Sequence, residues 1–162
     1  MGPTVPDILT AASVSHRPYS RCPGAGVYIT TANQLIGTYD DLDRLRSLPG
    51  IGREWYGGWE RHHIVEEQDL TRLGVAERFP PRSQQICVML PPAAHRKRVN
   101  SMLRGANPEG VRVTGVELWT AYEETYSMIG NYCGGGEVRI RRELLAIVAA
   151  IFAIAGVKRR TQ

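Results

Sequence analysis

The chain has 162 residues, of which 43% are hydrophobic and 22% charged, with a net charge of +4. This composition excludes a chain that is disordered throughout, and the length is enough for one domain with its own core. The small basic excess permits nucleic-acid binding but does not demonstrate it.

The first third of the chain shows one clear helix. Residues 1–35 are interpreted as an irregular lead-in, rich in proline at its start, with a short β-like run at 26–30. Thr38 is a suitable N-cap for the segment that follows. That segment places Leu42 and Leu45 three residues apart on one helical face.

The middle of the chain alternates strand-like and helix-like segments. WERHHIV at 59–65 is strand-like, and a loop follows at 68–85 that contains a short helix at 68–75. ICVML at 86–90 is apolar throughout, which indicates a buried strand. Two prolines then end the strand, and the residues after them, 93–105, are expected to form a helix.

The last third, 106–162, is expected to be helical, with helices over 113–132 and 137–156. The run from Leu144 to Val157 carries no charge and is fourteen residues long. A membrane span needs about 20 residues, so we interpret this run as a buried helix and expect no membrane partner.

Three histidines form the most informative pattern. His62 and His63 are adjacent on the first predicted strand, and His95 lies in the first turn of the helix after the second strand. Antiparallel pairing of the strands, with the helix packed against them, would bring the three imidazoles together. Adjacent residues on a regular strand point to opposite faces. His62 and His63 therefore share a site only where the strand ends or bulges, or where a scissile phosphate lies between the two faces.

This order of residues resembles a known nuclease family. HHIVEEQ, Phe79, CVMLP and His95 resemble the HNH/endonuclease VII-like nucleases, also called ββα-metal or His-Me finger enzymes, found as toxin domains in bacterial polymorphic toxins. The preceding GTYDDLDRLRSLPGIGREW is also similar to the lead-in of such toxins. The resemblance covers about residues 36–105.

The resemblance implies an α+β fold and a single nuclease toxin domain over 1–162. Its ββα-metal core, a hairpin plus a helix, would occupy 53–105 and be surrounded by additional helices.

The resemblance also implies roles for individual residues. His62 and His95 would bind a metal, and His63 would be the general base that activates water. Gln85 stands near the position of the family's Asn, a substitution that leaves this role in question. Glu66 is a candidate further ligand, and a solvated strand end is the alternative for it. Such an open ligand set suits one divalent ion, Mg²⁺, Mn²⁺, Zn²⁺ or Ni²⁺.

Basic residues surround these histidines in the sequence. Residues 51–105 carry nine Arg and Lys against six Asp and Glu, so most of the net charge falls here. The candidates for binding phosphate are Arg61, Arg96, Lys97 and Arg98. For any one of them, a solvated helix or strand face is an equal alternative.

These features predict a metal-dependent endonuclease, with DNA favoured as substrate, that acts as the C-terminal toxin module of an interbacterial effector. The alternatives are an RNase of the same fold and a non-catalytic domain that binds nucleic acid or protein. The resemblance further implies a cognate immunity protein. It also implies secretion within a larger effector and action in the target-cell cytoplasm, whereas a stand-alone enzyme would be cytoplasmic.

Overall fold

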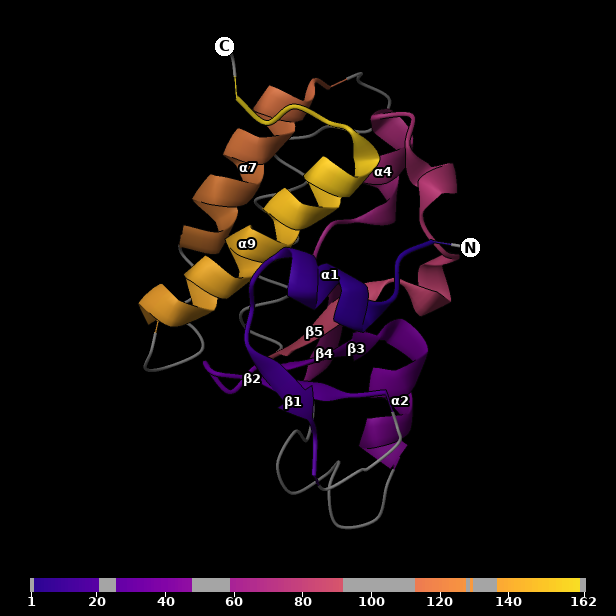
Figure 1. Ribbon diagram of the computed structural model, residues 1–162, viewed down its shortest axis with the longest axis vertical. Helices are drawn as coiled ribbons and strands as arrows, with labels where there is room; N and C mark the ends of the chain where they lie inside the picture. The colour runs from indigo at the N-terminus through magenta and orange to yellow at the C-terminus, as the bar shows by residue number, and fades with distance from the viewer. Residues whose placement is uncertain are drawn as a thin grey trace.

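A computed structural model describes residues 2–20, 26–47, 59–91, 113–127, 129 and 137–160. Within them an antiparallel sheet is combined with helices on both of its faces (Figure 1). The strands are β1 (His16–Pro18), β2 (Tyr28–Thr30), β3 (Leu35–Thr38), β4 (Glu60–His63) and β5 (Ile86–Leu90). The helices are α1 (Val5–Ala11), α2 (Tyr39–Ser47), α4 (Glu67–Arg72), α7 (Gly115–Ser127) and α9 (Glu137–Ala155), with short 3₁₀ turns η1 (Ala76–Arg78) and η2 (Arg82–Gln84). The α+β class predicted from the sequence is confirmed.

The sheet has the strand order β1-β2-β3-β5-β4, and every neighbouring pair is antiparallel. The two strands expected to form a hairpin therefore pair as predicted, with His62 opposite Val88 and His63 opposite Cys87. The helix expected over 93–105 lies outside the described residues, so the helical part of the ββα unit stays a prediction.

Strand β5 is buried along its whole length because both faces of the sheet are covered. Its alternate residues Ile86, Val88 and Leu90 join a large core with α1, α4, α7 and α9. Cys87 and Met89 point the other way, into a smaller cluster with Leu42 and Leu45 of α2. The sheet thus separates a large helical face from a smaller face covered by α2 (Figure 1).

The last helix is buried on one face, as its apolar run indicates, whereas Ala153 and Ile154 within that run are exposed. Ile147, Val148, Ile151 and Phe152 are all almost inaccessible to solvent. None of the helices in the described ranges combines the length and hydropathy needed to cross a bilayer. The expected helices over 113–132 and 137–156 correspond to α7 and α9.

The expectation of an irregular lead-in over 1–35 is wrong. This segment contains α1, β1 and β2, and β3 begins at its end. Helix α1 starts with a capping box, in which the Thr4 hydroxyl accepts from the amide of Asp7 and the Asp7 carboxylate accepts from the amide of Thr4. The prolines that suggested irregularity include one in the first helical turn, where a missing N–H has no consequence.

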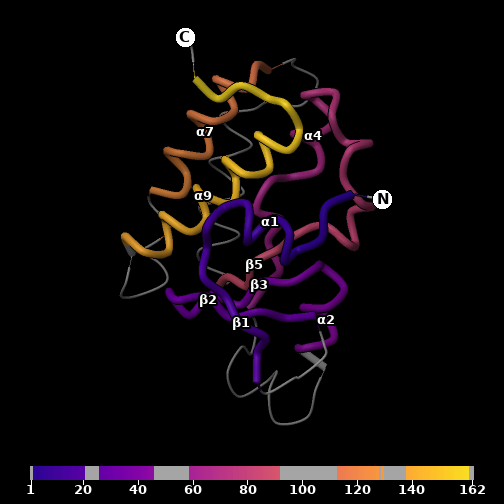
Figure 2. The backbone as a smooth tube through the Cα atoms, viewed as in Figure 1, coloured from indigo at the N-terminus to yellow at the C-terminus, as the bar shows by residue number. Residues whose placement is uncertain are grey.

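Helix α1 packs beside α9 although the two come from opposite ends of the chain (Figure 2). Ile8 and Leu9 of α1 are buried in the large core. The two ends of the sequence therefore close over the same face of the sheet.

A carboxylate of α9 forms hydrogen bonds with the turn between β2 and β3. Glu143 accepts hydrogen bonds from the Thr30 hydroxyl, the Ala32 amide at 3.1 Å and the Gln34 side-chain amide at 2.9 Å. Three donors of the β2–β3 turn thus bind the one carboxylate of Glu143. The turn and α9 are therefore joined by charge-assisted hydrogen bonds as well as by packing.

Replacing Glu143 with alanine should lower the free energy of unfolding by about 2–3 kcal/mol, because three donors lose a charged acceptor. Urea denaturation measures the change. Glu124→Ala, at an exposed position of α7, is the matched control and should be nearly neutral. Equal losses in the two variants would contradict this role of Glu143.

Candidate functional site

The predicted histidine pair ends strand β4, and its two side chains lie on opposite faces of the sheet. His62 contacts Tyr126 of α7 on the large helical face, whereas His63 stacks on Tyr39 of α2 on the other face. The one-to-one register with β5 is continuous through both residues, so no bulge within the pairing redirects either ring. The predicted metal ligand His62 and the predicted general base His63 therefore lie in different surroundings.

His63 has a defined tautomer. Its Nε2 lies 2.9 Å from the carbonyl oxygen of Arg82. Because a carbonyl only accepts, Nε2 carries the proton, and Nδ1 of the neutral ring holds the lone pair. The ring lies nearly parallel to Tyr39, with centroids 5.1 Å apart and an interplanar angle of 14°. His63 is thus held by one hydrogen bond and one stacking contact.

Two guanidinium groups, like His63, contact the ring of Tyr39. The Cζ atom of Arg61 lies 3.6 Å from the ring centroid and that of Arg82 lies 5.3 Å from it. Arg61 also donates to the Tyr39 carbonyl at 3.2 Å. We call Tyr39, Arg61, His63 and Arg82 the Tyr39 cluster.

The two arginines differ in exposure. The Arg61 side chain is 17% exposed and pairs with Asp43 at 3.5 Å, whereas the Arg82 side chain is 62% exposed and lies 3.8 Å from Glu67. An ion pair as exposed as that of Arg82 contributes little to stability. Arg82 is therefore the more available of the two cations to an incoming anion.

The surroundings of His63 favour the neutral ring. Burial lowers the pKa of His63, and the positive charges of Arg82 and Arg61 lower it further. The hydrogen bond to the Arg82 carbonyl and the negative charge of Glu67 act in the opposite direction, but the net shift in the pKa is downward. At neutral pH His63 is an uncharged imidazole beside two cations, which is the form that can accept a proton.

His62 belongs to a buried polar network on the other face. It is 1% exposed, and its Nε2 lies 2.8 Å from the hydroxyl of Tyr126. That hydroxyl donates its single proton to the Ile64 carbonyl, so His62 Nε2 must be the donor to Tyr126. In the neutral ring only Nδ1 of His62 has a lone pair for a metal.

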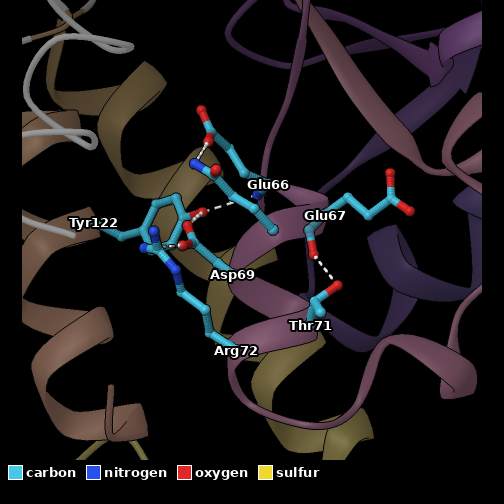
Figure 3. A network of polar contacts seen from close by, with 7 residues as sticks. Glu66, Glu67, Asp69, Thr71, Arg72 and Tyr122 are labelled. Carbon is cyan, nitrogen blue, oxygen red and sulfur yellow. Dashed lines mark hydrogen bonds and ion pairs between the residues drawn. The ribbon is translucent and has the colours of Figure 1, made fainter. Parts of the chain in front are cut away.

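A second buried tyrosine, Tyr122, packs against Tyr126 with ring centroids 5.7 Å apart and makes its own polar contacts with Asp69 of α4 and with Glu66 (Figure 3). The Tyr122 hydroxyl donates to the Asp69 carboxylate at 2.7 Å and accepts from the Glu66 amide at 2.8 Å. Arg72 lies 3.4 Å from the other oxygen of Asp69. Burial raises the pKa of Asp69, and the Tyr122 hydrogen bond and Arg72 oppose that rise. The network satisfies a carboxylate that is 1% exposed.

Glu66 and Gln85 have clear local partners. A carboxylate oxygen of Glu66 accepts from the Gln68 side chain at 2.7 Å. The Gln85 side-chain amide donates to the Pro80 carbonyl at 3.0 Å, and the backbone carbonyl of Gln85 accepts from the Tyr39 amide at 3.3 Å. Gln85 thus touches the Tyr39 cluster through its backbone, whereas its side chain is held by the preceding loop.

The other predicted site residues, His95, Arg96, Lys97 and Arg98, lie outside the described residues. Within the part of the chain that the structure describes, no three His, Cys, Asp or Glu side chains gather so as to hold a metal ion. The described donors alone therefore do not form a metal centre. Metal binding by His62 and His95 stays a prediction.

The sequence analysis did not identify Tyr39, Tyr122, Tyr126 or Asp69 as parts of the site. Tyr39 follows the cap Thr38, whose hydroxyl accepts from the Asp41 amide at 3.0 Å, so it is the first residue of α2. No local signal marks it, because its contact with His63 depends on how α2 crosses the sheet. Tyr122 and Tyr126 show only the spacing of a buried helix face.

Comparisons with known proteins add no constraint. Searches of protein-family models, of curated proteins and of solved structures give no match for this chain. The site is therefore interpreted from its own geometry and from the sequence motif.

We expect imidazole NMR to show a pKa below 6.5 for His63. In the neutral ring, the proton should be on Nε2. Arg82→Gln should raise this pKa because it removes a positive charge, and Glu67→Gln should lower it because it removes a negative one. Since the folded-state pKa is below the unfolded one, His63 should stabilise the fold fully above pH 6.5, with loss as the pH falls below that value. A lower pKa of His63 in Arg82→Gln, or a higher one in Glu67→Gln, would contradict this electrostatic picture.

The hydroxyl of Tyr126 should contribute measurably to folding. Tyr126→Phe removes the acceptor of His62 and the donor to Ile64, so the free energy of unfolding should fall by about 1–3 kcal/mol. Tyr28→Phe is the control, because within the described residues the Tyr28 hydroxyl makes no hydrogen bond. Chemical denaturation of both variants tests this, and a neutral Tyr126→Phe would rule out a supporting role for the hydroxyl.

Proposed function

We propose that this protein is an endonuclease that hydrolyses phosphodiester bonds, with DNA as the favoured substrate and His63 as the general base. The observation that carries the proposal is the Tyr39 cluster. It combines a neutral imidazole of fixed tautomer with two guanidinium groups. A phosphodiester is an anion whose hydrolysis needs a deprotonated water and a neutralised phosphate.

Each member of the cluster supplies one part of that chemistry. Nδ1 of His63 would take the proton of the attacking water, while Nε2 stays bonded to the Arg82 carbonyl and keeps the ring in place. Arg82 would contact the phosphate, since its side chain is largely exposed. The less exposed Arg61 would supply a second positive charge nearby. Tyr39 holds the imidazole and the guanidiniums in one stack.

Metal dependence is part of the proposal through the resemblance, with His62 and His95 as ligands of one divalent ion. Because His62 and His63 lie on opposite faces of β4, such an ion would reach the phosphate only at the end of the strand, between the two faces. There it would stabilise charge on the phosphate and on the leaving oxygen. Within the described residues the donors do not assemble into a site for it. The steps assigned here to His63, Arg61 and Arg82 do not pass through the ion.

The biological setting follows from the same resemblance. We propose that the chain acts as the toxin module of a larger interbacterial effector in the cytoplasm of the target cell. A producer of such a nuclease needs an immunity protein against it. An acidic protein would complement the cations of the Tyr39 cluster.

Purified protein should nick supercoiled plasmid in the presence of Mg²⁺, Mn²⁺, Ni²⁺ or Zn²⁺, and EDTA should stop the reaction. His63→Ala should lower the rate by about 10²–10⁴-fold, the usual contribution of a general base. His16→Ala is the matched control and should keep full activity. That histidine belongs to β1, at the edge of the sheet opposite β4, and its Nδ1 is bonded to the Val14 carbonyl.

The same assay with total RNA distinguishes the alternatives. Cleavage of RNA with intact plasmid would move the substrate from DNA to RNA. No cleavage of either polymer with any of the four ions would refute an enzyme and favour a binding domain. Full activity of a folded His63→Ala variant would refute the assignment of the base.

A further inference from the structure

A wide groove runs over the helical layer, on the side of the sheet away from α2. It is lined by the end of α1, by α7 and above all by α9, and its volume is about 760 Å³. Helix α9 lies between α1 and α7 (Figure 1). The Tyr39 cluster contributes no residue to its lining. A molecule in the groove would therefore leave the proposed nuclease site open.

The lining along α9 is apolar and consists mainly of small side chains. Ala146, Ala149, Ala150 and Ala153 recur at intervals of three and four residues, so they share one face of the helix. Ala146 and Ala149 are half-buried and Ala153 is exposed. Side chains this small let a second helix approach to an axis distance of about 8 Å, the short end of the usual range.

Positive charges stand at both ends of this apolar stretch. Arg141 and Arg142 precede the alanines on α9 and are exposed, and Arg159 follows the helix. The guanidinium of Arg159 lies 4.7 Å from the centroid of the Trp119 ring. Within the described residues none of the three arginines forms an ion pair, and Glu123 is the one acidic residue of the lining.

We propose that this groove binds an amphipathic α-helix of a protein partner, with an apolar stripe against the alanines and acidic side chains facing the arginines at each end. The stretch from Arg142 to Ala155 is about 20 Å long, which corresponds to a partner helix of three to four turns. Charge complementarity selects an acidic helix over a basic one. A nucleic acid would satisfy the arginines but has no apolar stripe to cover the alanines.

The test uses the full ¹⁵N-labelled chain and a synthetic peptide of about 18 residues. Leu and Ala form an apolar stripe at helical spacing, and Glu flanks the stripe. One matched peptide has Lys in place of every Glu, and another has the same composition in scrambled order. A short DNA oligonucleotide is titrated in parallel. The acidic amphipathic peptide should bind with a submillimolar Kd and shift the amides of Ala146, Ala149 and Ala153, whereas the Lys peptide and the scrambled peptide should not.

Two charge reversals on the same helix give a matched pair. Arg142→Glu should weaken binding of the acidic peptide by at least about fivefold, the scale of one exposed ion pair. Arg139→Glu should leave it unchanged, since Arg139 is exposed on α9 but does not line the groove. Circular dichroism confirms that both variants are folded.

Several outcomes would overturn the proposal. They are equal binding of the Lys peptide, shifts outside the groove, equal effects of the two reversals, or no peptide binding at millimolar concentration. Binding of the oligonucleotide that Arg142→Glu abolishes, without binding of the acidic peptide, would assign the groove to nucleic acid instead.

Discussion

The antiparallel pairing of β4 with β5 is the constraint on which the candidate site depends. Side chains alternate between the two faces of a strand, and the register continues through His62 opposite Val88 and His63 opposite Cys87. Two residues that look like one motif in the sequence are thereby placed in two environments. A shift of the register by one residue would exchange the two imidazoles between the faces.

The two environments differ in what they allow. On the helical face, the hydrogen-bonded pairs His62–Tyr126 and Tyr122–Asp69 lie side by side inside the large core, where an unpaired polar group would be costly. Such a network favours one arrangement of β4, α4 and α7 over others. On the α2 face, His63 lies beside cations with one ring nitrogen fixed by a backbone carbonyl. Among the described residues, this second environment combines a neutral imidazole with two nearby guanidinium groups, one of them largely exposed.

Local signals in the sequence predicted the elements that have strong patterns. The apolar run of β5, the Thr38 cap with Leu42 and Leu45, and the two C-terminal helices are all found in the structure. The strands β1 and β3 span three and four residues, too few for a pattern of alternation to stand out. Helix α1 has a local signal, the Thr4–Asp7 capping box, but the sequence analysis relied on the neighbouring prolines instead.

The candidate site was predictable in its histidines and not in its contacts. His62 and His63 were found because their residue type and spacing carry information. Their partners Tyr126 and Tyr39 are distant in sequence and are brought near by the crossing of α7 and α2 over the sheet. Gln85 was selected by position alone, and its side chain is held by Pro80 rather than by either histidine.

The central claim is that phosphate chemistry belongs to the α2 face, around His63. The most direct measurement is an NMR titration of the metal-free protein with a non-cleavable phosphorothioate oligonucleotide, following imidazole and guanidinium nitrogens. The account predicts shifts of His63, Arg61 and Arg82 with His62 unchanged. Shifts of His62 while His63 and both arginines stay unchanged would contradict it.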